Sequence, residues 1–184
     1  SPKGMGASKF AELVAAKTNG RITIHVAHSE QLGNENTNMG ALRTGTLDFG
    51  CLGQGALLSV APEVAAIGLP FLFSSLPDAW AALDGPVGQR LGKALESKNL
   101  VFLAWHCNGI RQTTNNKRPI TKPDDLKGLK IRTPLDSATV DMFAAMGATP
   151  QQISWGEVYL ALQSGVVDGQ ENPLANIYAG KLYE

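Results

Sequence analysis

The chain has 184 residues, in which 16 Lys and Arg balance 16 Asp and Glu, and 43% of the positions are apolar. This neutral charge excludes the basic face that binding to nucleic-acid phosphates requires. A charged fraction of 17% is too low for a disordered segment. No apolar run reaches the roughly 20 residues that cross a bilayer. The length allows one domain or two small lobes that share a core.

The first half of the chain alternates between helical and strand-like patterns. Helical spacing of the apolar residues predicts helices over 6–17, 35–44 and 77–98, the last one broken near Gly85. Three further runs have the alternation or the continuous apolar composition of strands: 21–26, 46–52 and 100–105. This alternation is typical of α/β layering.

The character of the sequence changes after Cys107, where a polar, Arg-containing segment begins. We therefore expect a first α/β lobe over 1–107 and a second over 108–184. The patterns of the second lobe predict, in order, a strand, a helix, a strand and a helix: 129–132, 137–146, 151–154 and 156–164.

An internal echo supports two similarly built lobes. Residues 41–48 match residues 161–168 at four positions, Ala, Leu, Gly and Asp, and each copy reads as a helix, a Gly cap and a strand. The alternative is that helix-Gly-strand junctions simply look alike. Two lobes imply a cleft, and small-molecule sites favour domain interfaces and the carboxyl ends of strands.

The two ends of the chain predict truncation. Ser1–Gly4 resembles the exit from an earlier element, and the helical pattern that starts at Leu174 is expected to continue beyond Glu184. The two cysteines, Cys51 and Cys107, are too few for a disulfide scaffold and are expected to be small buried apolar residues.

Patterns for catalysis, metal binding and cofactor binding are missing from the sequence. It contains no nucleophile elbow, P-loop or HExxH pair, and its three histidines are not spaced as ligands on one helix face. The glycines at 50, 53 and 55 come in the reverse of the dinucleotide order. Asp124 and Asp125 follow Pro123 in a turn, where Asp commonly binds local backbone. We expect no enzyme, no cofactor and no metal.

Two arginines stand out instead. Arg132 ends the predicted strand 129–132, so its guanidinium would project from the carboxyl end of that strand, where ligands bind in α/β sheets. Arg111 lies in the polar segment 108–114. A guanidinium grips a carboxylate through two parallel charge-assisted hydrogen bonds. The alternative is a solvated arginine on a surface strand or loop.

Three segments resemble the solute-binding proteins of TRAP (tripartite ATP-independent periplasmic) transporters of the C4-dicarboxylate type. They are 108–114 (NGIRQTT), 125–134 (DLKGLKIRTP) and the long, specific run 157–173 (EVYLALQSGVVDGQENP). Weaker features of the family occur in the expected order elsewhere, so the resemblance covers essentially the whole chain.

The resemblance implies a periplasmic-binding-protein-like α/β fold of two lobes, here truncated at both ends, with a central ligand cleft. It implies a periplasmic monomer, made with a signal peptide in the precursor, that captures a small organic anion and delivers it to a cation-coupled TRAP permease. The alternative function is a ligand-sensing module on the same fold.

Residue by residue, Arg132 resembles the family's principal carboxylate-clamping arginine and Arg111 a second arginine of the cleft. Asn172 resembles an asparagine that hydrogen-bonds the same carboxylate. Trp155 falls where sialic-acid-type members place an aromatic ring against the ligand, with core packing as the alternative. From the first lobe, Gln54 and Glu35 are the polar residues expected to contact the rest of the ligand.

The same resemblance reduces the number of possible solutes. Acidic groups that sialic-acid-type members carry around 53–55 are absent, and Lys130 stands where ectoine-binding members carry an aromatic residue. This leaves a C4-dicarboxylate, a uronate, or another sugar, hydroxy or keto acid.

Overall fold

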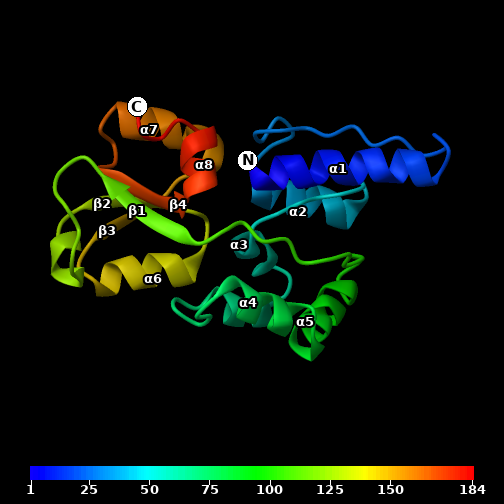
Figure 1. The fold of residues 1–184 in the computed structure, drawn as a ribbon, viewed down its shortest axis with the longest axis horizontal. Coiled ribbons are helices and arrows are strands. Elements are labelled where there is room, and N and C mark those ends of the chain that lie inside the picture. Colours follow the sequence, from blue (N-terminus) through cyan, green and yellow to red (C-terminus); the bar gives the residue numbers. More distant parts are fainter.

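The computed structural model describes all residues from 1 to 184, with a mixed sheet in the second half of the chain and helices in the first (Figure 1). The four strands are β1 (Arg111–Asn115), β2 (Lys130–Thr133), β3 (Thr149–Gln152) and β4 (Gly169–Pro173), in the order β1-β4-β2-β3. Strand β4 pairs antiparallel with β1 and parallel with β2, and β2 pairs parallel with β3.

Helices cover both faces of this sheet. Helix α6 (Ser137–Ala145) lies on one side, and α7 (Val158–Gln163) and α8 (Leu174–Ala179) lie on the other (Figure 1). Two short 3-10 turns, η2 (Pro123–Leu126) and η3 (Trp155–Glu157), precede β2 and α7. The largest buried cluster of this half joins η2, the sheet and α6: Leu126, Leu129, Ile131, Phe143 and Ala148.

The first half consists of helices around a separate core. Its elements are α1 (Pro2–Lys17), α2 (Glu35–Thr44), α3 (Gln54–Leu57), η1 (Pro62–Gly68), α4 (Leu76–Leu83) and α5 (Pro86–Glu96). Buried residues from α2, η1, α5 and the turn before η1 form this core: Met39, Val60, Ala61, Val64, Leu91 and Leu95. None of the helices in the structure combines the length and apolar character that a membrane span needs.

Three predicted strands in the first half are wrong. Residues 21–26, 46–52 and 100–105 are not in any strand, and residues 100–110 take part in no backbone–backbone hydrogen bond at all. Their composition suits a strand, but a strand exists only when a neighbouring strand receives its N–H and C=O groups. None of these segments has such a neighbour among residues 1–184.

The local patterns expected at the chain ends differ from the structure. Residues 2–4 lie in helix α1, which begins at Pro2 with Ser1 as its N-cap. Helix α8 ends at Ala179, and a backbone hydrogen bond from Leu182 N–H to Ile177 O closes its last turn. The sequence signal for this end is Gly180.

The remaining predictions hold in part. The second-half strand at 129–132 is confirmed as β2, and the one expected at 151–154 is β3, which begins two residues earlier. Both copies of the echo end a helix before a left-handed glycine, Gly45 (φ 74°) and Gly165 (φ 73°), but a strand follows only the second. Both cysteines are free thiols; Cys51 is exposed and Cys107 half-buried, so the expectation of two buried residues is wrong.

Candidate functional site

Three of the predicted residues meet at one edge of the sheet. Arg132 lies one residue before the end of β2, and Asn172 lies one residue before the end of the parallel strand β4. Arg111 is the first residue of β1, which runs antiparallel to β4, so it lies at the same edge. Arg132 is paired in register with Gln170 of β4. Because residues two apart on a strand share a face, Asn172 lies on the same side as Gln170 and Arg132.

Arg132 is a buried cation without a carboxylate partner in the chain. The residue is only 3% exposed. Its Nε and Nη2 donate to the backbone carbonyl of Ile153 at 2.8 and 2.6 Å. No salt bridge includes it. Burial lowers the pKa of Arg132 to about 10, and the nearby Glu171 carboxylate opposes this shift. The guanidinium is therefore charged at neutral pH, with both Nη1 hydrogens and one Nη2 hydrogen unpaired.

Arg111 has a different set of partners. Its Nε forms an ion pair with a Glu171 carboxylate oxygen, and its Nη2 donates to the other carboxylate oxygen at 2.6 Å and to the Glu171 backbone carbonyl at 2.9 Å. The same Nη2 also reaches the Asn172 Oδ1 at 3.5 Å. The Arg111 fork is thus largely satisfied by a residue of the neighbouring strand.

The central strand β4 is polar and fully buried, which is unusual because strands buried on both faces are normally apolar. Gln170, Glu171 and Asn172 are all 3% exposed or less. The Asn172 amide donates to Gln170 Oε1 at 2.7 Å, and the Gln170 amide donates to Thr114 Oγ1 at 2.9 Å. A chain of hydrogen bonds therefore fixes the Asn172 side chain at the edge where the two arginines lie.

Trp155 lies just beyond the same edge, in η3, two residues after the carbonyl that holds Arg132. Its ring packs against Gly180, because a Cβ placed there would come within 3.0 Å of it. Trp155 also lines a small hollow of about 220 Å³ together with Ser29 and Tyr159. The backbone N–H of the next residue, Gly156, donates to Glu30 Oε2 at 2.9 Å.

The two residues predicted from the first half hold its own structure. Glu35 Oε1 accepts hydrogen bonds from the Gly53 N–H at 2.8 Å and from Lys3 Nζ at 2.6 Å. The Gln54 amide donates to the Val64 carbonyl at 3.4 Å. Gln54 lies near the loop that follows β2, since a Cβ on the adjacent Gly55 would come within 2.5 Å of the Leu135 carbonyl.

Sequence reasoning missed several residues of this edge. The sequence gives no sign that Glu171 is the partner of Arg111. The run 169–173 has no alternation that marks a strand, and only its place after a helix and a left-handed glycine could have indicated one. A backbone acceptor such as Ile153 O leaves no signal in a sequence.

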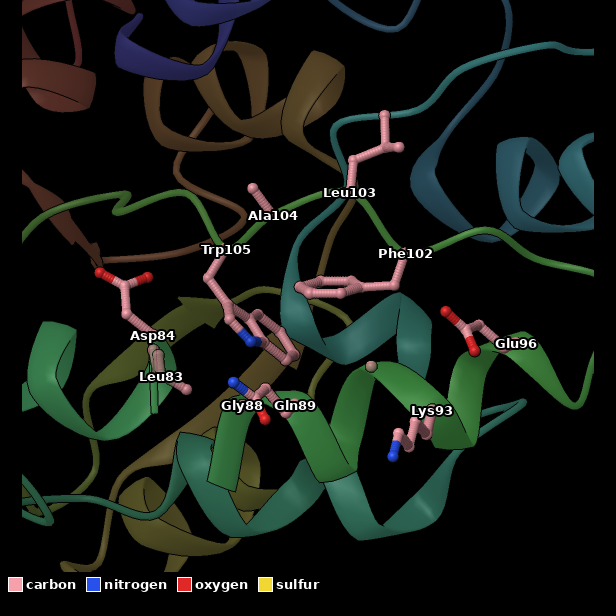
Figure 2. Close-up of a pocket in the computed structure, with 11 residues that line it drawn as sticks. Leu83, Asp84, Gly88, Gln89, Lys93, Glu96, Phe102, Leu103, Ala104 and Trp105 are labelled. Atoms are coloured by element: carbon pink, nitrogen blue, oxygen red, sulfur yellow. The ribbon is translucent and has the colours of Figure 1, made fainter. Parts of the chain in front are cut away.

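Another hollow lies between α5 and the extended segment 102–105 and has a volume of about 440 Å³. Figure 2 shows the rings of Phe102 and Trp105 above this helix. None of the predicted site residues lines it. No group of three or more His, Cys, Asp or Glu residues in the structure is arranged to hold a metal ion.

The whole chain, residues 1–184, matches the family model described as bacterial extracellular solute-binding protein, family 7. The chain belongs to this family. Its members are periplasmic solute-binding proteins of transport systems and not enzymes. One relative, the uncharacterised protein y4mM of Sinorhizobium fredii, is 53% identical over all 184 residues, which make up 34% of that protein.

Solved structures share the fold over nearly the entire chain. A TRAP periplasmic solute-binding protein of Polaromonas, with bound D-erythronate, is 37% identical with a TM-score of 0.95, over 99% of this chain and 60% of that one. Another, of Sulfurospirillum deleyianum with bound succinate, is 37% identical with a TM-score of 0.90, over 99% and 59%. The chain thus spans about three fifths of these structures.

Proposed function

We propose that this chain forms part of a periplasmic protein that binds a small organic acid and delivers it to a TRAP permease. Residues 1–107 and 108–184 belong to the two lobes of that protein, and the acid lies between them. The protein acts as a monomer. The acid is a C4-dicarboxylate, a uronate, or another sugar, hydroxy or keto acid, in keeping with the D-erythronate and succinate held by two structural neighbours.

One observation carries the proposal: Arg132 is buried and charged, and it forms no salt bridge within the chain, although the Glu171 carboxylate lies near enough to oppose the lowering of its pKa by burial. Buried charges are costly unless they are paired. The Ile153 carbonyl takes one N–H from Nε and one from Nη2, which leaves the end of the guanidinium free. That end presents two parallel N–H groups, the arrangement that a carboxylate accepts.

The other residues complete the site around this cation. Asn172, held by Gln170, offers an amide at the same edge. Arg111 adds positive charge, although Glu171 occupies most of its donors. Trp155 supplies an apolar wall. Gln54 and Glu35 lie on the opposing first-half side, where they would meet the part of the ligand distant from the carboxylate.

The test is a thermal-shift screen of the full-length protein with succinate, D-glucuronate, D-galactonate and pyruvate, followed by calorimetry. A ligand that binds only the folded state stabilises it by mass action. Arg132→Ala should lower the affinity about 100-fold or more, since it removes two charge-assisted hydrogen bonds.

The matched control is Arg90→Ala, which removes the same charge from the exposed face of α5 and should leave the affinity unchanged. Retained binding in Arg132→Ala would refute the carboxylate clamp. No binding of any acid by the folded wild type, freed of carried-over ligand, would refute the proposed solute class.

A further inference from the structure

The two halves of the chain are joined by one polar contact. The Gly156 N–H donates to Glu30 Oε2 at 2.9 Å, and no other hydrogen bond or salt bridge links residues 1–107 with residues 108–184. The remaining contacts between the halves are made by packing, for example where Gly55 of α3 meets the Leu135 carbonyl. Glu30 is therefore the one side chain that forms a hydrogen bond between the two halves.

The local backbone directs the Glu30 side chain to this contact. Ser29 and Glu30 are consecutive non-glycine residues with positive φ angles, 51° and 62°. Side chains disfavour this region, and it persists where surrounding interactions maintain it. Hydrogen bonds hold the turn from both sides: Gln31 Oε1 accepts from the His28 N–H at 3.1 Å, and the Glu30 carbonyl accepts from the Gly33 N–H at 2.9 Å.

The contact leads directly to the proposed anion site. Gly156 ends a four-residue segment that begins at Ile153, whose carbonyl receives the Arg132 guanidinium. The Ile153 N–H donates to the Thr133 carbonyl at 3.3 Å, so the inner end of this segment is fixed to β2. Glu30 fixes the outer end, and Trp155 lies between them. Burial lowers the pKa of Arg132, and the Glu30 charge is close enough to oppose this shift, after the larger effect of Glu171.

We propose that Glu30 is a positioning residue of the binding site, which acts through its hydrogen bond to Gly156. The bond holds the segment 153–156 against the first half and so favours the arrangement in which the halves close on a bound acid. This inference rests on the proposed function. Because Glu30 acts on closure and does not contact the ligand, its loss should weaken the binding of every acid by the same factor.

Two substitutions separate the hydrogen bond from the charge. Glu30→Ala removes both, and Glu30→Gln removes the charge but keeps an oxygen that can accept from the Gly156 N–H. If the hydrogen bond matters, Glu30→Ala should bind about threefold to tenfold more weakly, chiefly through faster dissociation. Glu30→Gln should bind as well as the wild type or more tightly, because it removes a negative charge near Arg132. If the charge alone mattered, both variants would bind an anion more tightly.

The measurement is calorimetry and stopped-flow dissociation with two different monocarboxylates, D-glucuronate and D-galactonate, on the full-length protein, so that the loss of the Glu30 charge affects both probes alike. For each variant the ratio of the two affinities should equal that of the wild type, and Glu96→Ala, on exposed α5, should change nothing. Unchanged affinity in Glu30→Ala, or a changed ratio between the acids, would overturn the proposal.

The outcome is distinguishable from a failure of the proposed function. If the wild type binds an acid and Arg132→Ala does not, the proposed role of Arg132 is supported. In that case, an affinity that Glu30→Ala leaves unchanged rejects only the role of Glu30. If the wild type binds neither the two probes nor any other acid of the screen, both proposals fall together. The unfolding temperature of the ligand-free variants separates lost closure from a damaged fold, since lost closure leaves it near that of the wild type.

Discussion

Arg111 and Arg132 lie at the same edge of the sheet but differ in what satisfies them. Arg111 is about one third exposed and is held by the buried carboxylate of Glu171. Arg132 is buried, and its partner is the uncharged carbonyl of Ile153. A cation already paired contributes to the fold, whereas a buried cation without a counter-ion is costly until an anion arrives. The same residue type therefore serves structure at one position and binding at the other.

This difference predicts opposite effects of the two alanine substitutions. Arg111→Ala leaves Glu171 buried without a partner and should lower the free energy of unfolding by about 1–3 kcal/mol, with less than about tenfold loss of acid affinity. Arg132→Ala should lose binding while the ligand-free protein is as stable as the wild type or more stable. Urea denaturation without ligand and calorimetry with ligand measure the two quantities.

Arg111→Lys extends the comparison. A lysine keeps the charge but lacks the planar fork that donates to both Glu171 carboxylate oxygens, so it should recover only part of the stability. Equal loss of binding in both alanine variants, with no change in stability, would show that Arg111 is a second ligand clamp rather than a partner of Glu171.

At the scale of elements, helices were more predictable than strands. The expected helix 35–44 is confirmed at its exact bounds as α2, because its apolar spacing, its Asn34 cap and its Gly45 stop are all local signals. Strands depend on distant partners. Residues 100–105 have strand composition but no neighbour, whereas the polar β4 is a strand because β1 and β2 flank it. The site followed the same rule: the cations were visible in the sequence, but Glu171 and Ile153, which decide their roles, were not.

The two left-handed glycines of the echo give a matched pair for a stability test. Gly45 and Gly165 have φ angles of 74° and 73°, and a Cβ built on either one meets no atom within 4 Å. An alanine at either position should thus cost about 1 kcal/mol of unfolding free energy through its backbone conformation alone. Urea denaturation should give the same loss for both variants.

Gly40 provides the control of opposite sign. It lies inside α2, and a Cβ there also meets nothing within 4 Å. Because alanine is the better helix former, Gly40→Ala should stabilise the protein by about 0.5–1 kcal/mol. Unequal losses at Gly45 and Gly165 would mean that the two junctions, although alike in backbone angles, differ in what they contact.

At the scale of the whole molecule, the two halves differ in how their backbones are satisfied. In the second half, β4 pairs with a strand on each side, so its amides lie in the middle of a sheet. Where the first half joins the second, the extended segment 100–110 has no backbone partner, and Val101 and Leu103 in it are exposed. An unpaired extended edge of this kind is where another chain can add a strand.

Hydrogen exchange should report this difference directly. In the 184-residue chain, the amides of 101–107 should exchange with little protection, and those of β4 should exchange at least about 100-fold more slowly, because opening β4 requires breaking the sheet. The backbone amides of Leu91 and Leu95 are the control. These two apolar residues are close in sequence to 101–107, but they are buried and lie within helix α5. Protection of 101–107 that matches β4 at low protein concentration would mean that a strand of the same chain covers this edge, contrary to the structure. Protection that rises with protein concentration would mean that copies of the chain pair along it, which is the behaviour that an exposed edge with apolar side chains predicts.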